Sequence, residues 1–66
     1  MITIDTVRSL SGRSVKVVTA GRTMHGVIAS YFGYGTVEST TIRVRYHGSR
    51  DSVTFQVTDL LELIAD

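Results

Sequence analysis

The sequence predicts a mainly β protein: a small barrel of five short strands, with an optional short helix in front of it. Three observations predict this class. Apolar and polar residues alternate with a period of two in several segments, glycines separate these segments, and no helical pattern is long enough to connect parallel strands. Alternating strands of this size close into a barrel or a sandwich. A length of 66 residues suits one domain, so residues 1–66 are expected to fold as a unit.

Helical and extended patterns compete in residues 3–11. Ile4, Val7 and Leu10 recur every three residues and would form one apolar stripe on a helix. Gly12 suits the left-handed position that commonly follows a helix. The alternation at the start of the segment also fits a strand, so both alternatives stay open.

A hairpin is predicted from residues 14–19 and 22–32. The second strand is the longest in the chain, and Gly26 lies near its middle, where a bent strand or a close backbone crossing needs room. Strict alternation divides its large apolar side chains between two faces. The face assigned to the core carries Met24, Ile28 and Phe32. The opposite face carries Val27, Ala29 and Tyr31.

The remaining strands are predicted in residues 41–46 and 52–58. The first of them alternates cleanly, so one face is core and the other, with Arg43 and Arg45, meets solvent or a ligand. Residues 59–65 are interpreted as a one-turn helix, a short last strand, or both. The glycine-rich loop that precedes these strands carries one large ring, that of Tyr34.

The charge of the chain is distributed unevenly, although the net charge is only +1. Residues 1–50 hold all seven lysines and arginines and carry a formal charge of +5, whereas residues 51–66 carry −4. Such asymmetry can steer a polyanion to one side of a protein. The alternative is a self-complementary surface, in which carboxylates of the tail lie near arginines of the body.

Interleaved basic and aromatic side chains favour a single-stranded nucleic-acid ligand, because small barrels combine cationic grooves with rings on which bases stack. The predicted nucleic-acid site comprises Lys16, Arg22, Arg43, Arg45, Tyr31 and Tyr34. The first hypothesis is therefore a non-enzymatic, nucleic-acid-associated regulatory protein.

The alternative hypothesis is a protein-binding adaptor or inhibitor of the phage or plasmid accessory type. A host protein would dock on a free sheet edge or on the apolar patch of Val27, Ala29 and Tyr31. A core this small also favours oligomerisation as a source of stability, so a homo-oligomer is expected.

Other classes of function find little support in the sequence. His25 and His47 have no Cys partners and no carboxylate at ligand spacing, so no metal site is predicted. No catalytic residues, cofactor or enzyme activity are expected, because no nucleophile, P-loop or triad motif is present. The absence of cysteine fits a reducing compartment, and no apolar run approaches the length of a membrane span. A cytoplasmic protein without membrane contact is expected.

The order of elements resembles the Sm-like fold of Sm and Hfq proteins. That fold has a short N-terminal helix, a hairpin whose second strand is bent at a glycine, two more strands and a short closing strand; residues 9–32 follow its hairpin pattern. The RNA-binding motifs of those proteins are missing here. There is no Asp followed by Met-Asn after the bent strand, and no Tyr-Lys-His.

The chain also resembles SH3-like barrels, including the type II dihydrofolate reductases. Residues 26–31 are similar to their Gly-x-Ile-x-x-aromatic stretch, and residues 61–64 are similar to their Leu-Glu-x-Ile. Their pore strand reads Val-Gln-Ile-Tyr, whereas residues 53–56 read Val-Thr-Phe-Gln. The resemblance therefore implies a small barrel without the residues of that reductase pore.

Overall fold

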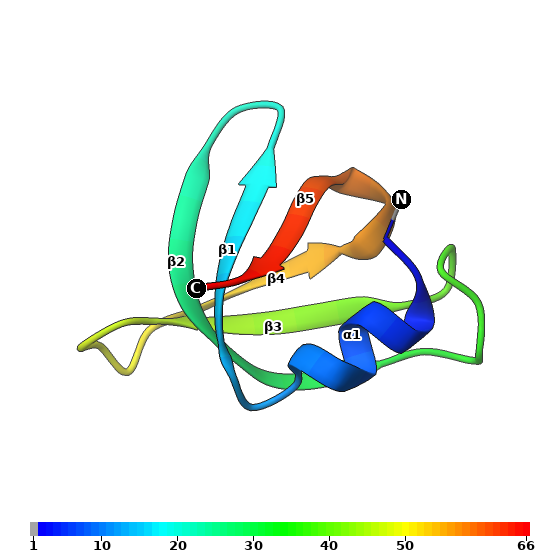
Figure 1. Cartoon of the computed structure of the whole chain (residues 1–66), viewed down its shortest axis with the longest axis horizontal. Helices are drawn as coiled ribbons and strands as arrows, with labels where there is room; N and C mark the ends of the chain where they lie inside the picture. Colours follow the sequence, from blue (N-terminus) through cyan, green and yellow to red (C-terminus); the bar gives the residue numbers. More distant parts are fainter. Residues whose placement is uncertain (1) are drawn as a thin grey trace.

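The computed structural model describes residues 2–66 and shows a short helix followed by a strongly curved antiparallel sheet (Figure 1). In chain order the elements are α1 (Ile4–Leu10), β1 (Ser14–Thr19), β2 (Thr23–Phe32), β3 (Thr41–Tyr46), β4 (Ser52–Gln56), the 3-10 turn η1 (Val57–Asp59) and β5 (Leu60–Ala65). The predicted β class and the number of strands are confirmed. The strand alternative for residues 59–65 is realised as β5, and the η1 turn before it takes residues 57 and 58 from the end of the strand predicted at 52–58.

The five strands form one open sheet with the order β4-β3-β2-β1-β5, and every neighbouring pair is antiparallel. The edge strands β4 and β5 are connected through η1, and no strand pairing joins them in residues 2–66. The strand pairing in residues 2–66 therefore does not close the sheet into the predicted barrel. Within the same residues, no helix is long and apolar enough to cross a membrane.

The N-terminal segment forms the helical alternative. The Thr3 side chain accepts a hydrogen bond from the Thr6 backbone N–H and caps the helix, as short hydroxyl side chains do at this position. Val7 and Leu10 are buried, so the predicted apolar stripe faces the sheet. Gly12 follows with a φ of 79°, the left-handed conformation predicted for it.

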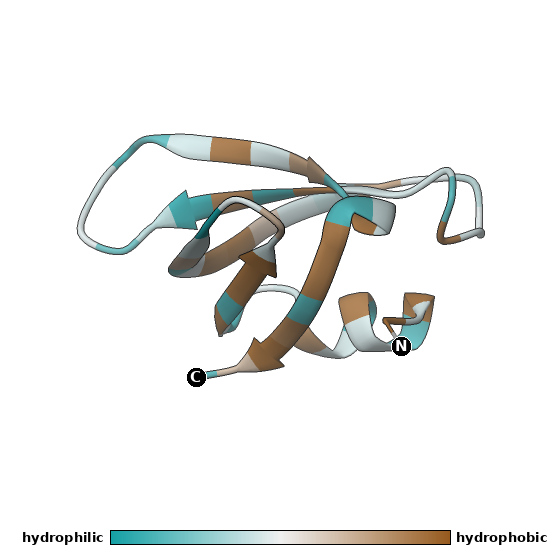
Figure 2. Ribbon diagram, turned by 90° about the horizontal axis from the view of Figure 1, so that it is seen from above, coloured by the Kyte–Doolittle hydropathy of each residue, from teal (hydrophilic) through white to brown (hydrophobic). Residues whose placement is uncertain are grey.

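The core lies between α1 and the inner face of the curved sheet. Its buried side chains come from the helix and from every strand, and apolar positions alternate with polar ones along the ribbon (Figure 2). The buried set comprises Val7, Leu10, Val15, Val17, Met24, Ile28, Ile42, Val44, Phe55, Val57, Leu60 and Leu63. Along residues 14–19 and 41–46 the buried residues recur with the period of two that a strand requires.

Gly26 occupies a place on β2 that leaves no room for a side chain. A Cβ atom built there would lie 2.2 Å from the Arg45 carbonyl oxygen and 2.9 Å from Cγ1 of Val44. Both neighbours belong to β3, whose Tyr46 lies directly opposite Gly26. The predicted need for space at this glycine is confirmed, and its cause is the close approach of β3 to the bent strand.

A β-bulge interrupts the pairing of β2 with β3. Ile28 lies opposite Val44, but the next paired residue, Ser30, lies opposite Arg43. Ala29 is therefore an extra residue on β2 without an opposite partner. A one-residue shift moves every following side chain to the other face of a strand.

This shift reverses the predicted orientation of two aromatic residues. Tyr31 lies opposite the buried Ile42 and so points toward the core side, where it is still 42% exposed. Phe32 lies opposite Thr41 and is 62% exposed on the other face. The prediction that Phe32 belongs to the core is wrong, because strict alternation was extended through the bulge.

Candidate nucleic-acid interface

The face of the sheet turned away from the core, here called the outer face, carries three of the six predicted nucleic-acid residues, Lys16, Arg43 and Arg45. Strand pairing places them side by side, since directly opposite residues project from the same face. On β3, Arg43 lies opposite Ser30 and Thr54, and Arg45 lies opposite Val27 and Ser52. The outer face comprises Lys16, His25, Val27, Ser30, Phe32, Thr41, Arg43, Arg45, Ser52 and Thr54.

The bulge brings an exposed ring beside one of the predicted cations. Phe32 and Arg43 line one shallow cavity of about 120 Å³, here called the aromatic cavity. Its other lining residues are Ser30, Tyr31, Thr41 and Thr54. The ring of Tyr34, 82% exposed, meets that of Phe32 edge to face, with 5.4 Å between centroids and 78° between planes. Phe32 was left out of the predicted site because it was assigned to the core face, and the sequence carries no signal for the bulge.

The other two predicted cations lie in different surroundings. Lys16 is half-buried on β1, opposite Ile64 of β5, and shares the outer face. Arg22 precedes β2, and its guanidinium donates a hydrogen bond to the Tyr46 hydroxyl and lies 5.9 Å from the centroid of that ring. Tyr46 is half-buried and packs against the core. Arg22 is thus held against the ring of Tyr46.

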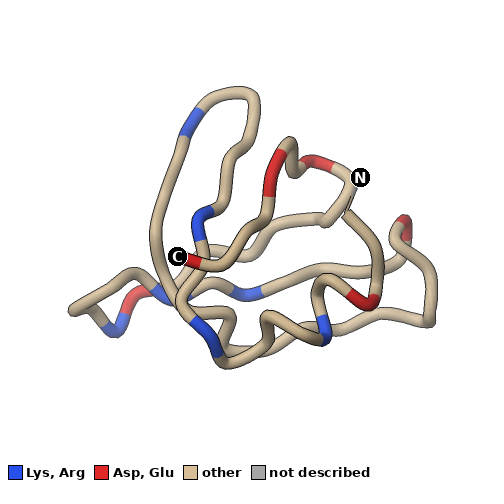
Figure 3. The backbone as a smooth tube through the Cα atoms, in the orientation of Figure 1, with Lys and Arg blue, Asp and Glu red and all other residues tan. Residues whose placement is uncertain are grey.

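The basic side chains are not neutralised by direct contacts with carboxylates. Throughout residues 2–66, the one ion pair joins His25 Nδ1 to Asp66 Oδ1 at 3.0 Å. The self-complementary alternative placed tail carboxylates near arginines, but the carboxylate of Asp66 meets a histidine instead. Figure 3 shows basic and acidic positions spread over several elements, with acidic positions within and beside the C-terminal strand. The guanidiniums of Arg43 and Arg45 therefore stay available to a ligand.

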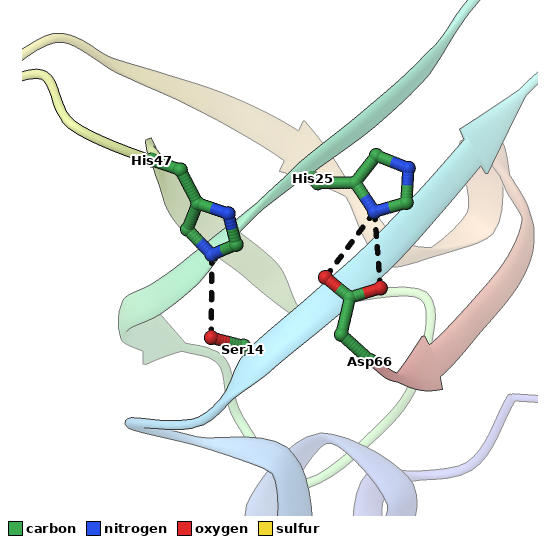
Figure 4. A network of polar contacts seen from close by, with 4 residues as sticks. All are labelled: Ser14, His25, His47 and Asp66. Atoms are coloured by element: carbon green, nitrogen blue, oxygen red, sulfur yellow. Dashed lines mark hydrogen bonds and ion pairs between the residues drawn. The ribbon is translucent and has the colours of Figure 1, made fainter.

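Two histidines, a serine and an aspartate form polar contacts on the same side of the sheet (Figure 4). His25 contacts Asp66, while Nε2 of His47 lies 3.2 Å from Oγ of Ser14. A catalytic triad needs one imidazole between the hydroxyl and the carboxylate. Here the hydroxyl and the carboxylate contact different imidazoles, so the arrangement is not that of a triad. In the described part of the chain, no three metal-ligating side chains gather.

The predicted apolar patch does not form a single surface. Val27 lies on the outer face opposite Arg45, Ala29 is the unpaired bulge residue, and Tyr31 points to the core side. The prediction that the three share one face is wrong because the bulge lies between them.

The exposed apolar side chains of the last strand were not predicted as a surface. Leu61 is 66% exposed and Ile64 is 46% exposed, both on the edge strand β5. A register shift between Val18 and Thr19 of β1 leaves Leu61 without an opposite partner. Alternation alone could not locate this second irregularity.

Comparisons of the chain with known protein families, with curated proteins and with solved structures found no match. The assignment of function therefore depends on the geometry of the outer face.

Proposed function

We propose that this protein is a non-enzymatic binding module that holds single-stranded nucleic acid on its outer face, in a regulatory role. The aromatic cavity carries this proposal, because it combines the exposed ring of Phe32 with the free guanidinium of Arg43. A base stacks on such a ring whatever its identity, and a neighbouring arginine contacts the phosphate backbone. Hydroxyl groups of Ser30, Thr41 and Thr54 add hydrogen-bonding partners in the same cavity.

The number of cations on the outer face limits the expected strength of binding. Lys16, Arg43 and Arg45 can each neutralise one phosphate, whereas Arg22 is engaged with Tyr46. Affinity that comes from a few phosphate contacts falls steeply with salt. The interaction is therefore expected to be sequence-tolerant, modest in affinity and easily observed only at low ionic strength.

Fluorescence anisotropy with labelled single-stranded RNA and DNA, at two salt concentrations, tests this function. The decisive variants are Phe32→Ala and the double substitution Arg43→Ala with Arg45→Ala. Arg13→Ala serves as a control. It also removes one positive charge, but Arg13 is exposed and is not a lining residue of the aromatic cavity or of the two other cavities. Absence of binding at low salt, or equal binding by all variants, would contradict the proposal.

A protein partner or a second copy of this chain is the second candidate ligand. The observation that favours it is the open sheet, whose edge strand β5 carries the exposed side chains of Leu61 and Ile64. An unpaired edge with apolar side chains is a template for pairing with another chain. Light scattering of the purified protein tests a homo-oligomer. A pull-down from host lysate with nuclease treatment distinguishes a protein partner from a nucleic acid.

The proposal includes a fold type and a compartment. A short helix before an antiparallel sheet in which β1 lies between β2 and β5 supports a small barrel of the Sm-like or SH3-like type. The absence of cysteine supports a reducing compartment, and hence the cytoplasm.

A further inference from the structure

A second and larger cavity lies beside the turn that connects β3 to β4. It has a volume of about 320 Å³ and is here called the turn cavity. Ligand pockets in proteins begin at about this size. Its lining consists of Val27, Arg45, Tyr46, His47, Gly48, Ser49 and Arg50.

The turn that borders this cavity is held by its own hydrogen bonds. The Tyr46 N–H donates to the Asp51 carbonyl at 3.1 Å, and the Ser49 N–H donates to the Tyr46 carbonyl at 3.2 Å. The Asp51 N–H donates to Oγ of Ser49 at 3.0 Å, and Gly48 supplies the positive φ of 72° that the turn requires. His47 is also tied to β1 through Ser14. The backbone of the turn is therefore held in place before a ligand arrives.

The charge of the lining is entirely positive. Arg45 projects from β3 and Arg50 from the turn, and neither lies within 4.0 Å of a carboxylate oxygen in residues 2–66. No carboxylate lines the cavity, while the imidazole of His47 offers a further hydrogen-bonding group and Val27 an apolar contact. The guanidiniums of two arginines that line one concave site match the oxygens of a phosphate group, which arginine binds in a bidentate manner.

We infer that the turn cavity binds a phosphomonoester, namely the terminal phosphate of a nucleotide or of a single strand that lies on the outer face. A phosphomonoester carries a charge of about −1.5 to −2 at neutral pH, which two guanidiniums can balance. An internal phosphate of a strand carries one negative charge. The charge of this site thus favours the end of a strand over its interior.

The position of the turn cavity supports this ligand. Arg45 in the turn cavity and Arg43 in the aromatic cavity are two residues apart on one face of β3, a separation of roughly 7 Å. One nucleotide can therefore place its phosphate between Arg45 and Arg50 and its base near Phe32. The inference depends on the proposed function only for the place of the base.

The test compares ligands that differ in one phosphate. Binding is measured for a ten-nucleotide single strand with a 5′-phosphate, with a 3′-phosphate or with hydroxyl ends, and for adenosine monophosphate against adenosine. One phosphorylated strand is expected to bind about tenfold more tightly than the hydroxyl-ended strand, which corresponds to about 1.4 kcal/mol. This gain should disappear in Arg50→Ala and Arg45→Ala and persist in Arg13→Ala. Arg50→Lys should recover only part of it, because lysine keeps the charge without the bidentate fork.

The outcomes separate this inference from the proposed function. If strands bind with equal affinity whatever their ends, or if Arg13→Ala removes the gain as fully as Arg50→Ala, the phosphate site is refuted and the nucleic-acid function stands. If adenosine monophosphate binds and shifts the amide signals of residues 45–50 while no strand binds, the phosphate site stands and the function is refuted. If no ligand binds at low salt, both are refuted.

Discussion

Tyr31 of β2 lies directly opposite the buried Ile42 of β3, whereas its neighbour Phe32 faces the opposite side of the sheet. Tyr31 also lines a small cavity with Ile4 and Val7 of α1. Adjacent aromatic residues on one strand thus have different surroundings: one packs near the helix, and the other is exposed on the outer face.

The two rings are expected to differ in their contributions to stability and binding. Tyr31→Ser should lower the free energy of unfolding by about 1–2 kcal/mol, because it removes a ring that packs near α1, whereas Phe32→Ala should change it by less than about 0.5 kcal/mol. Phe32→Ala should instead weaken binding of a single strand by about 1–3 kcal/mol. Urea unfolding and anisotropy measure the two effects. Equal stability of the two variants would contradict the assigned faces.

Gly26→Ala should destabilise the protein strongly. The added methyl group meets the Arg45 carbonyl oxygen, a backbone atom that cannot move aside without breaking the pairing of β2 with β3. The expected loss in unfolding free energy is about 3 kcal/mol, the upper end of the usual cost of overpacking. Gly21→Ala is the matched control, since a Cβ there meets nothing within 4 Å and its φ is not positive. That substitution should be neutral or stabilising by up to about 1 kcal/mol.

Thr3→Ala should weaken α1 by removing the side chain that accepts the Thr6 N–H. The expected cost is about 1 kcal/mol of unfolding free energy, and Thr3→Ser should restore most of it because serine caps equally well. Thermal unfolding followed by circular dichroism measures both variants. If Thr3→Ser is as unstable as Thr3→Ala, the capping hydroxyl is not the cause of the loss.

The salt dependence of binding should show which basic side chains contact phosphate groups. For single strands, each neutralised phosphate contributes roughly 0.7 to the slope of log affinity against log salt concentration. Arg43→Ala with Arg45→Ala should therefore reduce the slope by about 1.4. Arg22→Ala should leave it nearly unchanged, because that guanidinium is bound to Tyr46. A slope that falls equally in both variants would show that Arg22 also contacts the strand.

The spacing of apolar residues predicted the elements and most of the core, because the buried face of a strand or helix requires apolar residues at that spacing. Val15 and Val17 face inward as alternation requires, and Gly26 marked the close approach of two strands. Periodicity could not predict the bulge at Ala29, since an alanine satisfies a regular strand equally well. The candidate site changed accordingly, because the predicted faces of residues 30–32 were inverted.

Contacts between distant side chains were also beyond the reach of the sequence. The engagement of Arg22 by Tyr46 depends on the path of β3 across the bent strand, and the pairing of His25 with Asp66 depends on where β5 ends beside β1. The two irregular positions, Ala29 and Leu61, carry no distinctive residue type. Both irregularities are features of the strand pairing, which depends on contacts between residues that are distant in sequence.

The extra residue in β2 affects both the curvature of the sheet and the side chains that its outer face carries. β2 uses one residue more than β3 over the same length, and a bulged strand bends and twists more strongly than a regular one. The bulge at Ala29 therefore determines both how strongly the sheet curves and which aromatic ring projects from the outer face. An insertion or deletion at this point would therefore alter the shape and the chemistry of the outer face together.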